Sequence, residues 1–239
     1  MSVNEKMTAI ANAIRKHLDD LGPLNLDLMA HEIKNRLVEP ENYWASIFNN
    51  TFEGNLVNHK VKGSLPSNFQ SSNKNLTGIE LPLITTSSDY LCSSCYNLKF
   101  AKMQGFTTIK AGAFEGCSSL TRLYFPSATA IDGWGRSFSS CGNLEKIYFP
   151  KLTSIAGANC FLACTKLTTL ILEANTVCSL STSTVFGQTP IANGTGYIYV
   201  PSALVNSYKS ATNWSTFASQ FRAIEDYPTV TDDWGDYFD

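Results

Sequence analysis

The 239-residue chain has little charge. Asp, Glu, Lys and Arg make up 16% of it, and the formal net charge is −2. An ordinary globular domain has about 25% charged residues. Uncharged polar residues fill the difference, with 25 Ser, 22 Thr and 19 Asn. Because the chain also has 12% aromatic residues, it is not typical of a disordered segment. The composition favours short strands and turns in a rigid module.

Other absences exclude whole classes of protein. No run approaches the roughly 18 apolar residues of a membrane span, so we expect no membrane insertion. The N-terminus lacks the compact apolar core of a secretory signal peptide. The bulk charge does not suggest a nucleic-acid partner. There is neither a Walker loop nor a Rossmann glycine fingerprint, and no cofactor is expected.

The charge that is present is unevenly distributed. Residues 63–224 have 11 basic and 6 acidic side chains, whereas residues 225–239 have no basic and 6 acidic side chains. The middle of the chain is therefore at +5 and the end at −6. Such an acidic tail either docks on a basic surface, its own or a partner's, or is a solvated and frayed terminus. The second interpretation is the commoner one.

An internal repeat dominates the sequence. The stretch CSSLTRLYFP at residues 117–126 recurs as CGNLEKIYFP at 141–150 and as CTKLTTLILE at 164–173. The anchor leucines of five units are spaced by 22, 22, 24 and 23 residues; they are Leu76, Leu98, Leu120, Leu144 and Leu167. Each unit ends in alternating apolar residues, which predicts a short, half-buried strand. One unit cannot bury its own apolar side, so stacked copies must share a core.

The repeat unit resembles the BspA-type leucine-rich repeat of bacterial surface and prophage proteins. AGAFEGCSSLTRLYFP at residues 111–126 matches that unit closely, and the resemblance covers about residues 70–224. It implies a mainly β solenoid. The stretch at 197–224 resembles the end of such arrays, with a strand followed by an amphipathic capping helix bearing Tyr208, Trp214 and Phe217. Residues 99–108 lack the unit's proline, and residues 174–195 form a longer insertion.

The first 40 residues predict a separate helical hairpin. Two amphipathic stretches flank the break at Gly22 and Pro23. Their apolar positions are Met7, Ile10, Ile14, Leu18, Leu26, Met29 and Ile33. Two such short helices are marginal alone, which favours attachment to another protein or a homo-oligomer. The segment also resembles one near the start of phage and prophage tail and fibre proteins. The alternative is a plain helical hairpin.

These observations divide the chain into five parts. The helical hairpin at 1–40 is followed by a neck or N-terminal cap at 41–69 and the solenoid at 70–201. A capping helix at 202–224 and the acidic tail at 225–239 complete the chain.

The cysteines fit the repeat better than they fit a metal site. Four of the seven occupy one column of the repeat: Cys95, Cys117, Cys141 and Cys164. An inward column of small thiols packs as a ladder. A zinc site needs four converging ligands, and we therefore expect no metal. The odd count also argues against a disulfide framework.

No catalytic constellation stands out. The three histidines are His17, His31 and His59, so the repeat region has none. The acidic residues of the repeats occupy different positions, and nothing converges on a glycosidase pair. We therefore expect a protein that is not an enzyme.

The outward positions of the predicted strands offer a candidate binding face. Side chains alternate between the two sides of a strand, so stacked repeats align their outward residues in two columns. These columns are rich in tyrosine and in basic residues. The candidate face residues are Lys102, Arg122, Tyr124, Lys146, Tyr148, Ile171, Tyr197 and Tyr199. Tyr and Arg are enriched at binding hot spots. The alternative is an aromatic ladder that only stabilises the sheet.

The combined prediction is a non-enzymatic virion component of a phage or prophage, in a tail fibre, tail tip or baseplate. Its N-terminal helices would contact other virion proteins, and the repeat face would bind a host-surface glycan or protein. The alternatives are a bacterial or protist cell-surface adhesin, which would be extracellular, and a purely structural decoration or spacer protein.

Overall fold

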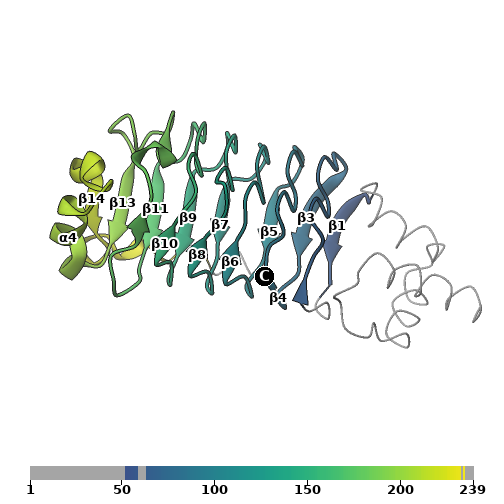
Figure 1. Ribbon diagram of the computed structural model, residues 1–239, viewed down its shortest axis with the longest axis horizontal. Helices are drawn as coiled ribbons and strands as arrows, with labels where there is room; N and C mark the ends of the chain where they lie inside the picture. Colours follow the sequence, from purple (N-terminus) through teal and green to yellow (C-terminus); the bar gives the residue numbers. More distant parts are fainter. Residues whose placement is uncertain (1–51, 59–62, 233, 235–239) are drawn as a thin grey trace, which may run out of the picture.

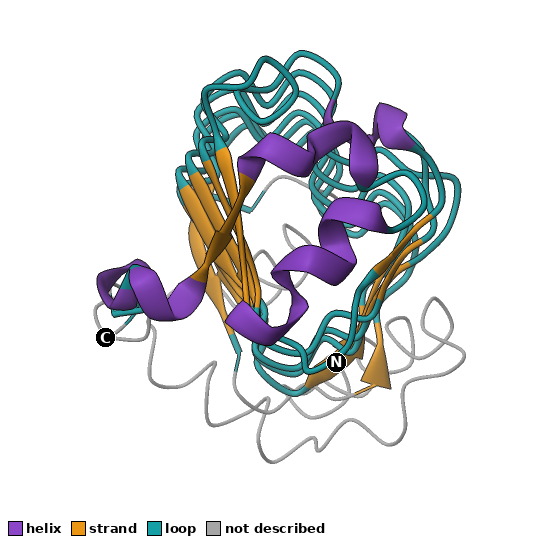
Figure 2. Cartoon of the chain, turned by 90° about the vertical axis from the view of Figure 1, so that its left-hand side faces the viewer, coloured by secondary structure: helices purple, strands orange, loops and turns teal. Residues whose placement is uncertain are grey.

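Parallel strands on two sides of a shared core make up most of the fold. The computed structural model describes residues 52–58, 63–232 and 234. Successive strands along the repeats alternate between the two sides, so each repeat crosses the core twice (Figures 1 and 2). Such parallel-strand sheets with few helices fit a leucine-rich-repeat-like fold, as the sequence predicts. The predicted helical hairpin at 1–40 lies outside the described residues.

Two sheets form the first side. The three-stranded sheet has the order β1-β3-β5, from β1 (Gly54–Val57), β3 (Leu76–Glu80) and β5 (Phe100–Lys102). The five-stranded sheet continues this side in the order β7-β9-β11-β13-β14. Its strands are β7 (Arg122–Tyr124), β9 (Lys146–Phe149), β11 (Thr169–Leu172), β13 (Tyr197–Val200) and β14 (Phe221–Ala223). β5 and β7 remain in contact although they belong to different sheets. This interruption coincides with the unit that lacks the proline.

One six-stranded sheet forms the second side. Its strands are β2 (Gly63–Ser64), β4 (Ile84–Thr86), β6 (Thr108–Ile109), β8 (Ala130–Ile131), β10 (Ser154–Ile155) and β12 (Ser179–Leu180). Threonine hydroxyls reinforce this side. The Oγ1 atoms of Thr107, Thr129 and Thr153 each donate to a backbone oxygen of the preceding repeat, at 3.0–3.1 Å. This use of hydroxyls explains part of the Ser and Thr excess in the composition.

Aromatic rings stack from repeat to repeat in the core. Phe114, Phe138, Phe161 and Phe186 form one continuous column, with successive ring centroids 5.8, 5.4 and 5.4 Å apart. All four rings are fully buried, as are the five anchor leucines. Because each ring packs on the equivalent ring of the next repeat, the core is continuous along the whole array.

The cysteine column is both buried and hydrogen-bonded. The four thiols each donate to a backbone oxygen of the preceding repeat: Cys95 to Gln70 at 2.9 Å, Cys117 to Cys92 at 3.0 Å, Cys141 to Phe114 at 3.1 Å and Cys164 to Phe138 at 3.0 Å. In the unit before Cys95, the amide Nδ2 of Asn73 donates to Phe52 O at 2.9 Å. All seven cysteines are free and buried. The column therefore supplies hydrogen-bond donors as well as small apolar volume.

The turns use left-handed backbone, at most positions in residues other than glycine. One column has positive φ at Asn68, Tyr90, Gly112 and Arg136, and a second one has it four residues later in each unit. The left-handed conformation costs an L-residue roughly 1–2 kcal/mol. Each such amide donates to a carbonyl of the next repeat, for example Tyr90 N to Ala111 O at 2.8 Å and Arg136 N to Ala158 O at 3.1 Å. The stacking of repeats, rather than glycine, imposes this turn.

The C-terminal elements cover the end of the array. They are η2 (Ser202–Leu204), α4 (Val205–Ser210) and η3 (Ser215–Gln220), and the insertion before β13 contains η1 (Ser183–Phe186). Tyr208, Trp214 and Phe217 are buried against the last repeat. The indole nitrogen of Trp214 donates to Cys178 O at 2.6 Å, and Cys178 N donates to the Tyr208 hydroxyl at 2.9 Å. Figure 2 shows these helices across the opening between the two sides. Two further short helices, η4 (Ile224–Asp226) and η5 (Pro228–Val230), follow β14 on the outer side of the five-stranded sheet.

The cap differs from the single helix predicted over 202–224. The α-helix ends at Ser210, and Asn213 has φ of 64°, which no α-helix continues through. The break lets Trp214 turn into the core, and residues 221–223 then pair with β13 as a further parallel strand. The sequence pattern indicated the apolar side chains of the cap but not this strand.

Candidate recognition surface

The two outward columns lie in register in the described sheets. Tyr124 pairs with Tyr148, which pairs with Ile171, which pairs with Tyr199. The other column runs from Arg122 through Lys146 and Thr169 to Tyr197. In the three-stranded sheet, Gly78 pairs with Phe100 and Glu80 with Lys102. The spacing of the repeats therefore places aromatic and cationic side chains next to one another along one side of the molecule.

Tyr124 and Tyr148 are the centre of this surface. Their rings stack with centroids 5.0 Å apart. The Tyr148 hydroxyl donates to the Glu173 carboxylate at the end of the neighbouring strand. Burial raises the pKa of both tyrosines, and the negative charge of Glu173 adds to that shift. Both phenols are therefore neutral hydrogen-bond donors over the whole physiological pH range.

The residues at the end of the chain cover the middle of the face. Tyr148 is only 8% exposed and Ile171 is fully buried, because Ile224 and Trp234 pack on them. The expectation that these two side chains face solvent is therefore wrong for this conformation. The outward direction was predicted from strand alternation, but alternation cannot reveal that a later segment of the same chain lies on top.

Trp234 is the main contact of this covering segment. Its ring lies 5.4 Å from that of Tyr124 and 5.8 Å from that of Tyr148. The ammonium group of Lys146 lies 5.1 Å from the centre of the indole ring, which is a cation–π contact. The described part of the predicted acidic tail, residues 225–232 and Trp234, thus lies on the repeat body through apolar, aromatic and cation–π contacts, and the rest of the tail lies outside the described residues.

The two ends of the face are less covered. At one end the Phe100 ring lies directly over Gly78, where any β-carbon would clash with it, and the Lys102 ammonium lies 5.9 Å from the centre of that ring. At the other end Tyr197 is 36% exposed. The Arg222 guanidinium lies 4.3 Å from the centre of the Tyr197 ring, and Arg222 pairs with Tyr199, so a strand absent from the sequence prediction adds a cation to this end of the face.

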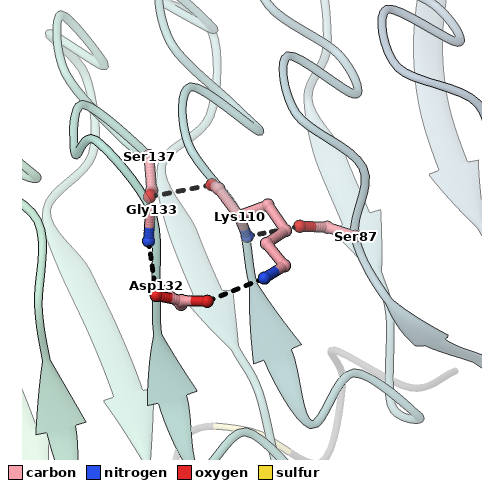
Figure 3. A network of polar contacts seen from close by, with 5 residues as sticks. All are labelled: Ser87, Lys110, Asp132, Gly133 and Ser137. Carbon is pink, nitrogen blue, oxygen red and sulfur yellow. Dashed lines mark hydrogen bonds and ion pairs between the residues drawn. The ribbon is translucent and has the colours of Figure 1, made fainter.

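The most exposed aromatic side chain of the described residues lies outside the predicted columns. Trp134 follows β8 and is 93% exposed. Its loop is fixed at the base, where Asp132 accepts from Lys110 Nζ at 2.7 Å and from the amide of Gly133 at 2.7 Å (Figure 3). The Lys110 backbone is held in turn by the hydroxyls of Ser87 and Ser137. A tryptophan between two glycines in an extra-long unit was the sequence signal for this loop, and the repeat pattern alone overlooked it.

The described part of the chain contains neither a candidate metal-ion site nor a candidate membrane-spanning helix. No group of three or more His, Cys, Asp or Glu side chains within it is arranged to hold a metal ion. No helix among the same residues is both long and apolar enough to cross a membrane. The predicted attachment residues from Met7 to Ile33 lie outside the described residues, so their role stays a prediction.

Comparison with known proteins supports the repeat assignment. A search of curated proteins found no match to the chain. Repeats of the BspA type suggest surface adhesion or recognition. The stretch that carries the stacked strands, residues 85–195, matches the family model described as the BspA type leucine rich repeat region, in six copies.

Proposed function

We propose that the chain is a non-enzymatic recognition protein of a phage or prophage virion, which attaches by its N-terminal segment and binds a host-surface glycan or protein with its repeat face. The observation that carries the recognition role is the pair of in-register columns of tyrosine, lysine and arginine. The similarity of residues 85–195 to BspA-type repeats supports surface recognition in general. The resemblance of the first 40 residues to tail and fibre proteins supports the virion.

The chemistry of the face suits this role. Neutral phenols stack on flat apolar surfaces and donate hydrogen bonds, and the neighbouring cations attract anionic groups. Hot-spot residues of such interfaces each contribute about 2 kcal/mol or more. No constellation of groups suited to catalysis recurs along the repeats.

The test uses the full chain and the less covered ends of the face. A Lys102→Ala/Tyr197→Ala variant is expected to bind host cells at least tenfold more weakly than the unmodified chain. The matched control is Lys166→Ala/Tyr96→Ala, which removes the same side-chain types from exposed positions outside the columns. Equal binding by the two double variants would refute the face assignment.

The main alternative is a cell-surface adhesin, since BspA-type repeats are typical of extracellular or surface proteins. Mass spectrometry of purified virions and of the cell-surface fraction of the source distinguishes the virion proposal from the adhesin alternative. Recovery with virions supports the first proposal, and recovery only with cell envelopes supports the adhesin. For the third possibility, a spacer, deletion of residues 70–224 would change particle stability and leave adsorption intact.

A further inference from the structure

The C-terminal segment runs back across the face, against the order of the repeats. After β14 the chain forms η4 and η5, and Tyr227 contacts Tyr199 of β13 with ring centroids 5.5 Å apart. Trp234 then reaches Tyr148 of β9 and Tyr124 of β7. The segment thus lies along the outward tyrosine column over four neighbouring strands, from β13 to β7.

The segment forms a small core of its own on the outside of the sheet. Tyr148, Ile171, Ile224 and Trp234 make a buried cluster separate from the main core, with Tyr124, Tyr199 and Val230 packed around it. An indole therefore rests against two tyrosine rings while the Lys146 ammonium covers it. The cluster thus accommodates an aromatic side chain, and the net charge of +5 over residues 63–224 favours an acidic segment on this face.

The covering segment is held by side chains rather than by a sheet ladder. Within the described residues, no strand follows β14. At its start the Glu225 carboxylate accepts from the amide of Ser202 at 2.9 Å. The contacts further along are the ring and cation–π contacts of Tyr227 and Trp234. An occupant held in this way can be exchanged without breaking a β-ladder.

We propose that the tyrosine face is a docking site for an acidic polypeptide segment that bears an aromatic side chain, and that residues 225–232 and Trp234 occupy it in cis until such a segment displaces them. This inference rests on the proposed recognition role and narrows its ligand from a glycan or protein to a polypeptide of stated chemistry. The chain's own segment shows one occupant that the site accepts: an indole packed on two tyrosine rings and beside a lysine ammonium group.

The test probe is a fluorescent peptide with the sequence of residues 225–239. A tethered segment competes at an effective concentration in the millimolar range, so the unmodified chain is expected to bind the peptide poorly. The full-length Trp234→Ala variant, with the face uncovered, is expected to bind it at least tenfold more tightly. In that background Lys146→Ala is expected to weaken binding about threefold, the loss of one exposed cation–π contact.

Two controls keep the outcome interpretable. Full-length Trp234→Phe retains a ring for the site and is expected to exclude the peptide, as the unmodified chain does. Tyr96→Ala, which alters an exposed tyrosine outside the columns, is expected to leave peptide binding unchanged. Circular dichroism of each variant confirms that the repeat body is folded.

Several results would overturn the inference. One is equal peptide affinity for the unmodified chain and for Trp234→Ala, and another is full affinity for a peptide in which alanine replaces Trp234. Tighter binding of a heparin oligosaccharide than of the peptide to Trp234→Ala would assign the site to anionic glycans instead. Host-cell binding by the unmodified chain is measured separately, so its loss would refute the proposed function and not the peptide site.

Discussion

Side chains at equivalent positions of the repeats have the same structural role, and the buried thiols are the clearest example. Burial raises the pKa of Cys117 and Cys141, and it raises the pKa of Cys160 and of Cys178 to about 12. Since thiolate is the reactive form, protonated thiols donate to carbonyls and do not act as nucleophiles. These four cysteines are therefore structural rather than reactive. The pKa of Cys95 is instead lowered by its hydrogen bond with Cys92, and burial of the side chain shields that thiol from reagents.

This explanation predicts thiol behaviour in the native chain. At pH 8 a disulfide reagent such as dithionitrobenzoate is expected to leave the seven thiols unmodified and to titrate all of them once urea unfolds the protein. A Thr165→Cys variant, at an exposed position, serves as the positive control and is expected to react within minutes. Rapid native reaction of two or more of the natural thiols would contradict their assigned place in the core.

The Asp132–Lys110 pair gives a second prediction at this scale. Hydrogen bonds from Lys110 and from the amide of Gly133, with the charge of Lys110, lower the pKa of Asp132. A lowered folded pKa contributes stability above the ordinary carboxyl value, and that contribution is lost as the pH falls through the folded pKa. Lys110→Met is thus expected to raise the pKa of Asp132, as measured by NMR titration.

The same variant should cost little stability. The pair is partly exposed, with the two side chains 34% and 50% accessible, so solvent screening limits it to about 0.5 kcal/mol at neutral pH. The difference between Lys110→Met and the unmodified chain is expected to vanish below the folded pKa of Asp132. A difference that grows on acidification would refute this account.

At the scale of elements, the end cap decides whether the last repeat is stable. Trp214 packs against Phe186 with centroids 5.9 Å apart and against Tyr208 at 5.5 Å. Without the cap, the Phe186 end of the ring column would face water. Terminal repeats of such arrays require a covering element for this reason.

Trp214→Ala is therefore expected to destabilise the protein by about 3–5 kcal/mol, as for a fully buried aromatic side chain. Urea denaturation followed by circular dichroism measures the change. Trp134→Ala is the matched control, since a 93% exposed indole is expected to contribute within about 0.5 kcal/mol. Similar losses in the two variants would mean that the cap does not close the core.

The elements that could be predicted from the sequence depend on local spacing, whereas those that could not depend on contacts between distant residues. The strands, the anchor leucines and the cysteine column follow from local spacing, and the register of the outward columns follows from the repeat length. By contrast, the pairing of residues 221–223 with β13 depends on a chain reversal after Asn213. The docking of Trp234 on Tyr124 joins residues 110 positions apart, which no repeat pattern encodes.

For the molecule as a whole, a single core joins the repeats. One buried cluster runs from Phe52 to Phe221, whereas Trp234 belongs to the separate outer cluster. The stability of a stacked repeat is shared with its neighbours, so central repeats with two neighbours are the best protected. Among the described residues, the outer cluster packs on one sheet face.

Hydrogen exchange should reveal this difference. The amides of β9 and β11 are expected to exchange most slowly, and those of residues 225–232 to exchange much faster, before any global unfolding. Uniform protection from residue 63 to residue 232 would show instead that the covering segment and the repeat body unfold as one unit.

The left-handed turn residues have a consequence for how the surface can change. Tyr90 and Arg136 differ in size and charge, yet both adopt the same turn conformation, and the next repeat accepts their amide hydrogens. The turn is thus encoded by position rather than by residue type. Side chains along this edge can therefore differ where the adjacent repeat leaves room, whereas at Gly112 a β-carbon would clash with the Tyr90 ring. Within that limit, the same scaffold can acquire a new pattern of surface chemistry without a new backbone.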